Sequence, residues 1–302
     1  MRVFRLITWT AAVFALSATS GAVLALKTEI PRTILGEVSY AVRGGLGLEK
    51  SWKALPGPEQ AAGRKRATCP DPARTVVLIT GGQSNATNVV PSRHRSSGGV
   101  FTWFAGRCYP GSDPLLGTGG YDGSLWSLLA DRLHERISRP VLLINGAVGG
   151  TQFSDWIDAR SGYYAALQAR VTEAGAAGYV PSLILRHQGE TDAAVLKDMA
   201  ELQRDMTVLF QNLSRDMGGA EVYMFRATRC IGPGRVDGVP EVNAAQKRVA
   251  ESLATVHLGL DTDLLDREYR WDTCHFNALG RAEIAKRVVP DLMQLLDDRE
   301  AS

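Results

Sequence analysis

The chain has 302 residues, of which 22% are charged and 45% hydrophobic, and its formal net charge is +2. This length is sufficient for one large domain or two small ones with a substantial core. The near-neutral charge, without a long block of one sign, excludes the composition typical of nucleic-acid-binding proteins, and we expect no nucleic acid as a partner.

The N-terminus has the pattern of an export signal. Arg2 and Arg5 precede an uncharged, largely apolar stretch over residues 6–26. Its length lies between that of the apolar part of a signal peptide and a membrane span of roughly 20 residues. We therefore expect residues 1–26 to be a signal peptide or an N-terminal membrane anchor. The protein would be exported to the periplasm or the extracellular space and could stay attached to the membrane.

Residues 27–74 are rich in proline, glycine and charge and are predicted to be a linker, which leaves residues 75–302 as the folded domain. The chain has four cysteines, at positions 69, 108, 230 and 274. An even number in an exported chain permits two disulfides in any of three pairings. A bond between Cys69 and Cys108 would tie the start of the domain to the loop after its first strand. Unpaired buried thiols are the alternative.

Apolar strands and helical patterns alternate along the domain. Short apolar runs predict strands over residues 75–80, 140–145, 182–188, 221–227 and 256–261. Helical patterns lie between and after them, over residues 124–137, 163–174, 193–213, 242–254 and 278–296. Continuous apolar strands separated by helices are typical of a parallel sheet that is covered on both faces. The sequence therefore predicts an α/β fold, a three-layer α/β/α sandwich.

Polar or glycine-rich clusters follow these strands. They are "GGQSN" (81–85), "NGAVGGT" (145–151), "HQGETD" (187–192) and, before the last helix, "DTCHFN" (272–277). Each cluster alone could be an ordinary turn, helix cap or surface loop. Because ligands gather at the carboxyl ends of parallel strands, the four together indicate a functional site at one edge of the sheet.

Residue types in these clusters fit nucleophilic catalysis. A serine hydroxyl such as that of Ser84 needs a neighbouring imidazole to accept its proton, and His275 is the candidate base. Asp272 could orient the imidazole and stabilise its protonated form. The oxyanion that forms in acyl transfer needs donors, each typically contributing roughly 3–4 kcal/mol. Candidate donors are the backbone N–H groups of Ser84 and of Gly149 or Gly150, and the side-chain amide of Gln188.

The blocks "GGQSNA", "GAVGGT", "QGETD" and "DTCHFN" resemble those of SGNH (GDSL-like) hydrolases, in particular sialate O-acetylesterases and acetylxylan esterases. The resemblance covers about residues 75–290. It implies a flavodoxin-like parallel sheet of about five strands, with Ser84 as the nucleophile, His275 as the base and Asp272 as its acid partner. Some similar proteins use the glutamate of the third block as the acid, so Glu190 is the alternative to Asp272.

Two tryptophans are candidates for a substrate-binding surface. Trp103 lies in the long connection over residues 86–123, and Trp156 follows the second glycine-rich cluster. Connections of this length in compact domains are often functional, and aromatic side chains pack well on sugar rings. Packing into the core is the alternative for both side chains.

The resemblance implies a serine esterase that removes O-acetyl groups from a carbohydrate through an acyl-enzyme, without a metal or cofactor. One alternative is an O-acetyltransferase that passes the acetyl group to an envelope glycan. The other is a non-catalytic carbohydrate-binding relative, which the presence of Ser84, Asp272 and His275 together disfavours.

Overall fold

The computed structural model describes residues 54–195, 197–230 and 239–301. The signal peptide or anchor predicted over residues 1–26 lies outside these ranges. Within them, no helix combines the length and the hydropathy that a membrane span requires.

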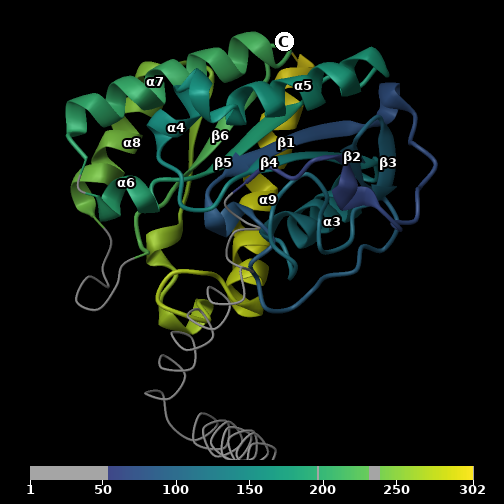
Figure 1. The fold of residues 1–302 in the computed structure, drawn as a ribbon, viewed down its shortest axis with the longest axis horizontal. Helices are drawn as coiled ribbons and strands as arrows, with labels where there is room; N and C mark the ends of the chain where they lie inside the picture. Colours follow the sequence, from purple (N-terminus) through teal and green to yellow (C-terminus); the bar gives the residue numbers. More distant parts are fainter. Residues whose placement is uncertain (1–53, 196, 231–238, 302) are drawn as a thin grey trace, which may run out of the picture. The chain divides into compact units, whose positions relative to one another are not determined.

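A seven-stranded sheet organises the compact unit (Figure 1). Its order is β3-β2-β4-β1-β5-β6-β7, and every neighbouring pair is parallel except β2 and β3. The strands are β1 (Val76–Gly82), β2 (Val100–Phe104), β3 (Arg107–Pro110), β4 (Val141–Ala147), β5 (Leu183–His187), β6 (Glu221–Arg226) and β7 (Val256–Asp261).

The five predicted strands are all present, as β1, β4, β5, β6 and β7, but the expected number of about five was too low by two. Strands β4, β1, β5, β6 and β7 lie side by side in that order, which is the flavodoxin-like arrangement 2-1-3-4-5. The two further strands, β2 and β3, form a hairpin on the edge next to β4. They are short and have no helix between them, so the strand–helix alternation did not reveal them.

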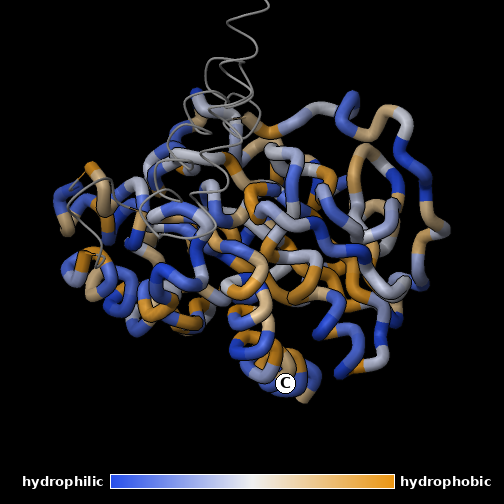
Figure 2. Tube along the Cα trace, turned by 90° about the horizontal axis from the view of Figure 1, so that it is seen from below, coloured by the Kyte–Doolittle hydropathy of each residue, from blue (hydrophilic) through white to orange (hydrophobic). Residues whose placement is uncertain are grey.

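Helices cover both faces of the sheet (Figure 1). Helices α3 (Leu125–Ile137) and α9 (Ala278–Ala301) pack on one face. The other face is covered by α4 (Phe153–Ile157), α5 (Tyr163–Ala176), α7 (Met199–Asp216) and α8 (Pro240–Ser252). Hydrophobic residues, orange in Figure 2, run through the interior, and the helices alternate between orange and blue. The predicted three-layer arrangement is therefore present.

The helix predicted over residues 193–213 is divided in the structure. The short helix α6 (Glu190–Ala194) follows β5 directly, and α7 begins at Met199. Asp198 caps α7, because its side chain accepts a hydrogen bond from the backbone N–H of Glu201. The cap fixes the start of α7 at Met199, six residues later than predicted.

Residues 54–74, in the second part of the predicted linker, pack against the domain. Arg170 donates a hydrogen bond to the backbone oxygen of Pro56, and the backbone N–H of Ala67 donates to the backbone oxygen of Cys108. Cys69 and Cys108 form a disulfide, which belongs to one of the three pairings that the sequence left open. The compact unit therefore begins before residue 75, because these contacts join the preceding segment to β3 and α5.

Candidate active site

The first predicted cluster forms a tight turn at the carboxyl end of β1. Gly82 has φ of +133°, and a Cβ atom there would lie 1.9 Å from the backbone oxygen of His187 on β5. Only glycine allows this approach. Ser84 then begins the short 3₁₀ helix η4 (Ser84–Ala86) and is 7% exposed. The turn lies between β1 and β5, where the strand order reverses and α/β proteins bind ligands.

The structure brings Ser84, His275 and Asp272 together. The Oγ atom of Ser84 lies 2.9 Å from Nε2 of His275. The Nδ1 atom of the same ring lies 2.8 Å from Oδ2 of Asp272. The ring of Trp271 stacks against the imidazole with a centroid distance of 5.8 Å. This chain of hydrogen bonds is the geometry needed to move a proton from a serine hydroxyl to an imidazole.

The surroundings of Asp272 keep its carboxylate ionised. Burial raises the pKa of this carboxyl, but His275 and the backbone N–H groups of His275 and Cys274 lower it more, so the pKa lies below its usual value. Its Oδ1 atom accepts hydrogen bonds from both of those N–H groups, which leaves Oδ2 for the imidazole. The loop therefore fixes the carboxylate in the orientation that holds His275.

Glu190, the alternative acid, has a different place in the network. Its Oε1 atom accepts a hydrogen bond of 2.9 Å from the side chain of Asn85 and lies 3.4 Å from Nδ1 of His187. The same Asn85 side chain donates to the backbone oxygen of Cys274 and accepts from the backbone N–H of Phe276. Asn85 thus holds the residues on both sides of His275, and Glu190 orients Asn85.

A disulfide joins the residue before His275 to the segment that follows β6. The bond connects Cys230 and Cys274. Donor atoms of these two cysteines and of His275 lie within 4.8 Å of one another, which is close enough for a shared metal ion. Because the two sulfurs are bonded to each other, they are poor metal ligands, and the group serves as a covalent anchor for the histidine loop.

We expect the double variant Cys230→Ser/Cys274→Ser to lose both stability and turnover. Opening a loop of 44 residues should lower the free energy of unfolding by about 2–4 kcal/mol. Looser placement of His275 should lower kcat by about 10-fold or more. Urea unfolding and initial rates below the unfolding transition measure the two effects. Cys69→Ser/Cys108→Ser is the matched control: it should lose similar stability and keep kcat. An equal loss of kcat in the control would refute a special role for the second disulfide.

The predicted oxyanion donors lie around the same edge. Gly150 has φ of +74°, a conformation that favours glycine, in the turn after β4. Gln188, after β5, is fully buried, and its Nε2 atom donates a hydrogen bond of 3.3 Å to the backbone oxygen of Thr151. The turn that contains Gly149 and Gly150 is therefore connected to Gln188 through Thr151.

The two tryptophans predicted to bind substrate lie in the core. Trp156 is fully buried, and its indole N–H donates to the hydroxyl of Thr151. Trp103 is 4% exposed and packs against Tyr179 with ring centroids 5.5 Å apart. Neither indole offers a surface to a sugar in this structure. Both rings belong to one hydrophobic core cluster. Trp103 is buried because part of the connection over residues 86–123 packs down as the β2–β3 hairpin, and Trp156 is buried because α4 packs on the sheet.

Sequence reasoning missed Arg186. It lies on β5 inside an apolar run, its exposure is 1%, and it donates a hydrogen bond to Gln188. A charged residue in a buried strand was the signal available in the sequence. The neighbouring His187 faces the opposite side of the sheet, where its ring lies near those of Phe225 and Phe276.

Asp192 is a second buried charged group near the site. Its exposure is 0%, and its Oδ1 atom accepts from the backbone N–H of Phe153. Burial raises the pKa of this carboxyl to about 7. An acid whose pKa is higher in the folded protein than in the unfolded chain binds more protons when folded, so stability decreases as the pH rises through this interval.

We expect Asp192→Asn to remove this pH dependence. In the unchanged protein, the free energy of unfolding should fall between pH 4 and pH 7 by up to about 4 kcal/mol from this group. The variant should match it near pH 4 and become increasingly more stable above pH 5. Urea unfolding at several pH values measures the difference. The exposed Asp297→Asn is the control, and parallel curves for all three proteins would contradict the assignment.

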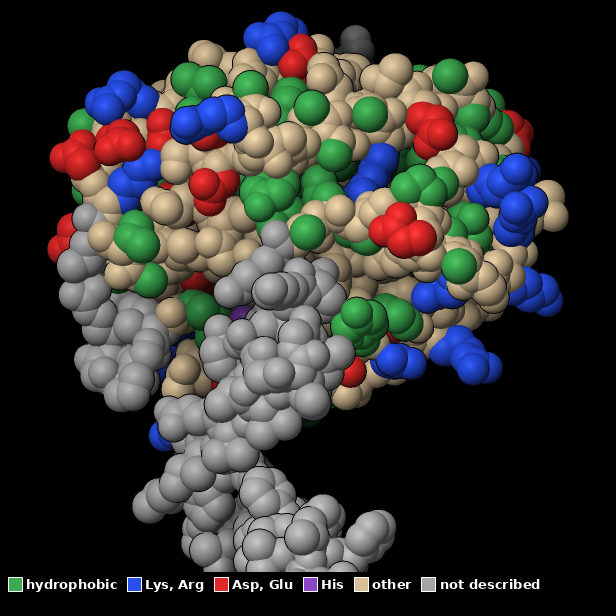
Figure 3. All heavy atoms as spheres, viewed as in Figure 1, with side chains coloured by type: hydrophobic (Ala, Val, Ile, Leu, Met, Phe, Trp, Pro, Cys, Tyr) green, Lys and Arg blue, Asp and Glu red, His purple; other side chains and the backbone are tan. Residues whose placement is uncertain are grey.

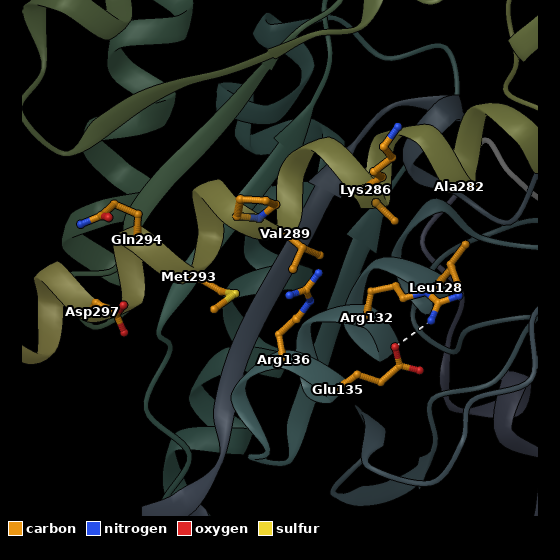
Figure 4. A pocket seen from close by; sticks show the side chains of 12 residues that line it. Leu128, Arg132, Glu135, Arg136, Ala282, Lys286, Val289, Met293, Gln294 and Asp297 are labelled. Carbon is orange, nitrogen blue, oxygen red and sulfur yellow. Dashed lines mark hydrogen bonds and ion pairs between the residues drawn. The ribbon is translucent and has the colours of Figure 1, made fainter.

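A surface groove lies away from these residues, between α3 and α9 (Figure 4). Arg132, Arg136 and Lys286 line it together with apolar side chains such as Met293. None of the predicted site residues contributes to its lining. On the face seen in Figure 3, basic and acidic side chains are interspersed.

Comparisons with known proteins give one family and a set of similar folds. The family model described as "carbohydrate esterase, sialic acid-specific acetylesterase" matches residues 126–294. This range contains Gln188, Asp272 and His275, and Ser84 precedes it. A comparison with curated protein sequences gave no match.

Two solved structures illustrate the similarity of the fold. A protein from Arabidopsis thaliana is 19% identical with a TM-score of 0.60, over 73% of this chain and 98% of that one. NanS is 14% identical with a TM-score of 0.54, over 76% of this chain and 100% of that one.

Proposed function

Because the chain belongs to the carbohydrate esterase family of sialic acid-specific acetylesterases, we propose that it removes O-acetyl groups from a carbohydrate through an acetyl-serine intermediate. The chain is a carboxylic ester hydrolase by this membership. The observation that carries the proposed mechanism is the pair of hydrogen bonds from Ser84 to His275 and from His275 to Asp272.

In the first half of the reaction, Ser84 attacks the acetyl carbonyl while Nε2 of His275 accepts the hydroxyl proton. The carbonyl oxygen becomes an oxyanion, stabilised by the backbone N–H groups of Ser84 and Gly149 or Gly150 and by the amide of Gln188. As the intermediate collapses, the bond to the sugar oxygen breaks, and His275 passes its proton to that oxygen. The sugar leaves with a free hydroxyl, and the acetyl group stays on Ser84.

In the second half, His275 accepts a proton from a water molecule that attacks the acetyl-serine. A second oxyanion forms in the same place, and as it collapses the bond to Oγ of Ser84 breaks and His275 returns its proton to that oxygen. The product is acetic acid, which loses its proton to solvent as acetate, and Ser84 and His275 are restored. Asp272 stays ionised throughout and stabilises the imidazolium that forms in each half. The low pKa of its carboxyl supports this role.

The experiment that tests the function measures where the acetyl group goes. The full chain is incubated with acetylated xylan, O-acetylated sialic acid and O-acetylated bacterial envelope glycan, and both acetate and acetylated acceptor sugars are quantified. An esterase releases acetate in an amount equal to the acetyl groups lost. Acetylation of an added acceptor without acetate would favour the transferase, and binding without either product would favour the non-catalytic relative.

We also propose that the protein is exported. Arg2 and Arg5 followed by the apolar residues 6–26 support this, and so do two disulfides, which persist in oxidising compartments. Cell fractionation of a C-terminally tagged chain tests the location. Recovery with the periplasm, the medium or the membrane agrees with export, and recovery with the cytoplasm contradicts it.

A further inference from the structure

The guanidinium of Arg186 is fully enclosed yet incompletely bonded. The side chain points from β5 to the face covered by α4, α5 and α7, and its exposure is 1%. In the described part of the chain, its Nε and NH1 atoms have no hydrogen-bond partner. A buried polar group without a partner lowers the stability of the fold. A contribution to stability therefore does not explain why an arginine occupies this position.

Three neighbours fix the position of this guanidinium. It lies over the ring of Trp156, with 4.0 Å from its central carbon to the ring centroid. On another side it approaches the backbone of β1, where a Cβ atom on Gly81 would lie 2.8 Å from NH1. Gly81 lies three residues before Ser84. The absence of a side chain at this position therefore makes room for a cation beneath the carboxyl end of β1.

The third neighbour is Gln188, a predicted oxyanion donor. The NH2 atom of Arg186 donates a hydrogen bond of 2.6 Å to Oε1 of Gln188. On the other side of the amide, Nε2 of Gln188 donates to the backbone oxygen of Thr151 at 3.3 Å. An amide nitrogen carries two hydrogens, and the bond to Thr151 uses one of them. With both ends held, the amide has one defined orientation and a second hydrogen to donate.

The charge of Arg186 is weakly compensated. Burial lowers the pKa of its guanidinium to about 9, and Asp192 raises it. At neutral pH the guanidinium is therefore protonated. Burial raises the pKa of Asp192 to about 7, so this carboxylate is only partly ionised at the same pH. In a dry interior, a positive charge of this kind acts strongly on nearby dipoles.

We propose that Arg186 is a positioning residue for the oxyanion hole, which acts through Gln188. It holds the amide oxygen so that Nε2 is presented to the oxyanion, and its charge polarises the amide, which makes the N–H a stronger donor. The proposal rests on the proposed acyl transfer at Ser84. In this proposal, Gln188 is a stronger hydrogen-bond donor than a glutamine without a cation beside its amide oxygen. Gly81 and Trp156 contribute by enclosing the guanidinium.

A double-mutant cycle on a generic ester tests this proposal. The full chain and its variants Arg186→Met, Gln188→Leu and Arg186→Met/Gln188→Leu are assayed with p-nitrophenyl acetate, so that the result does not depend on the sugar. We expect Gln188→Leu to lower kcat about 100-fold and Arg186→Met about 10-fold, with KM changed less than 2-fold. If Arg186 acts through Gln188, the double variant is no slower than Gln188→Leu alone. Multiplication of the two losses in the double variant overturns the proposal.

A structural role for Arg186 predicts that its replacement lowers stability and kcat together. A positioning role predicts a different result. Because the guanidinium is incompletely bonded, its replacement by methionine should then leave the free energy of unfolding unchanged or raise it. Arg186→Lys keeps the charge and should recover part of the lost kcat. A fall in stability that accompanies the fall in kcat, with no recovery in Arg186→Lys, contradicts a positioning role.

A measurement that needs no turnover separates this proposal from the proposed function. The side-chain amide signals of Gln188 are assigned in NMR spectra by their loss in Gln188→Leu. In the unchanged protein they should be distinct and slow to exchange with solvent, and in Arg186→Met they should exchange at least 10-fold faster. Unchanged exchange overturns the role of Arg186 even if the enzyme is active. If the expected exchange is found in a chain that hydrolyses no ester, the proposed function fails and the hold of Arg186 on Gln188 stands.

Discussion

Replacing Ser84 with alanine should lower kcat for acetate release by at least about 10⁴-fold. The residue supplies the nucleophile that attacks the ester in the proposed mechanism, and without it only water can attack the bound ester. The substitution removes one oxygen atom, so the fold should persist. Initial rates with an acetyl ester give the effect on turnover, and thermal unfolding checks the fold.

A second buried serine provides the control for this variant. Ser127 lies in α3, and its hydroxyl donates to the backbone oxygen of Ser124. Ser127→Ala should keep kcat within 2-fold. If Ser84→Ala keeps the rate of the unchanged protein, Ser84 is not the nucleophile.

Asp272→Asn should lower kcat about 10³- to 10⁴-fold, whereas Glu190→Gln should lower it about 10-fold or less. Asparagine cannot stabilise the imidazolium as a carboxylate does, and it can hold the wrong tautomer of His275. Glutamine at position 190 still offers an oxygen to Asn85, so the support that Glu190 gives to the histidine loop is largely retained. The pair of rates distinguishes the two candidate acids.

The pH dependence of these two variants sharpens the comparison. In Asp272→Asn, loss of the partner carboxylate should shift the pH at which kcat/KM falls. In Glu190→Gln, that pH should stay nearly unchanged. A larger fall in kcat for Glu190→Gln, with a displaced pH profile, would make Glu190 the acid partner and reduce Asp272 to a loop residue.

Much of the sheet could be predicted because its central strands contain short continuous apolar runs and are buried. The run that became β1 is buried at every position, and a helix follows each of the strands β4, β5, β6 and β7. The hairpin of β2 and β3 lacks the second signal, because no helix lies between its two strands. Its turn at Ala105 and Gly106, where both residues have positive φ, is specified by local geometry and by packing on β4.

The part of the candidate site that lies at the carboxyl ends of neighbouring parallel strands could be predicted from the sequence. Ser84 and Gln188 follow neighbouring strands, so their approach is a consequence of topology. The position of His275 depends on contacts far apart in the sequence, such as that of Asn85 with Cys274 and the bond of Cys274 to Cys230. No local pattern specifies such contacts.

The burial of Trp103 and Trp156 illustrates the same limit. An aromatic side chain near a motif can face a ligand or the core, and the choice depends on the neighbours that the fold supplies. Trp156 packs under Arg186 and bonds to Thr151, so it supports the site from within. Its indole is fully buried and offers no surface to a sugar.

Covalent capture tests whether Ser84 is acylated with the help of His275. The protein is incubated with a small phosphonate ester that reacts with activated serines, and the modified peptide is located by mass spectrometry. We expect one adduct per chain, on the peptide that contains Ser84, with labelling lost in Ser84→Ala and slowed at least 100-fold in His275→Ala. Labelling at another residue, or equal labelling of Ser84 in His275→Ala, would contradict it.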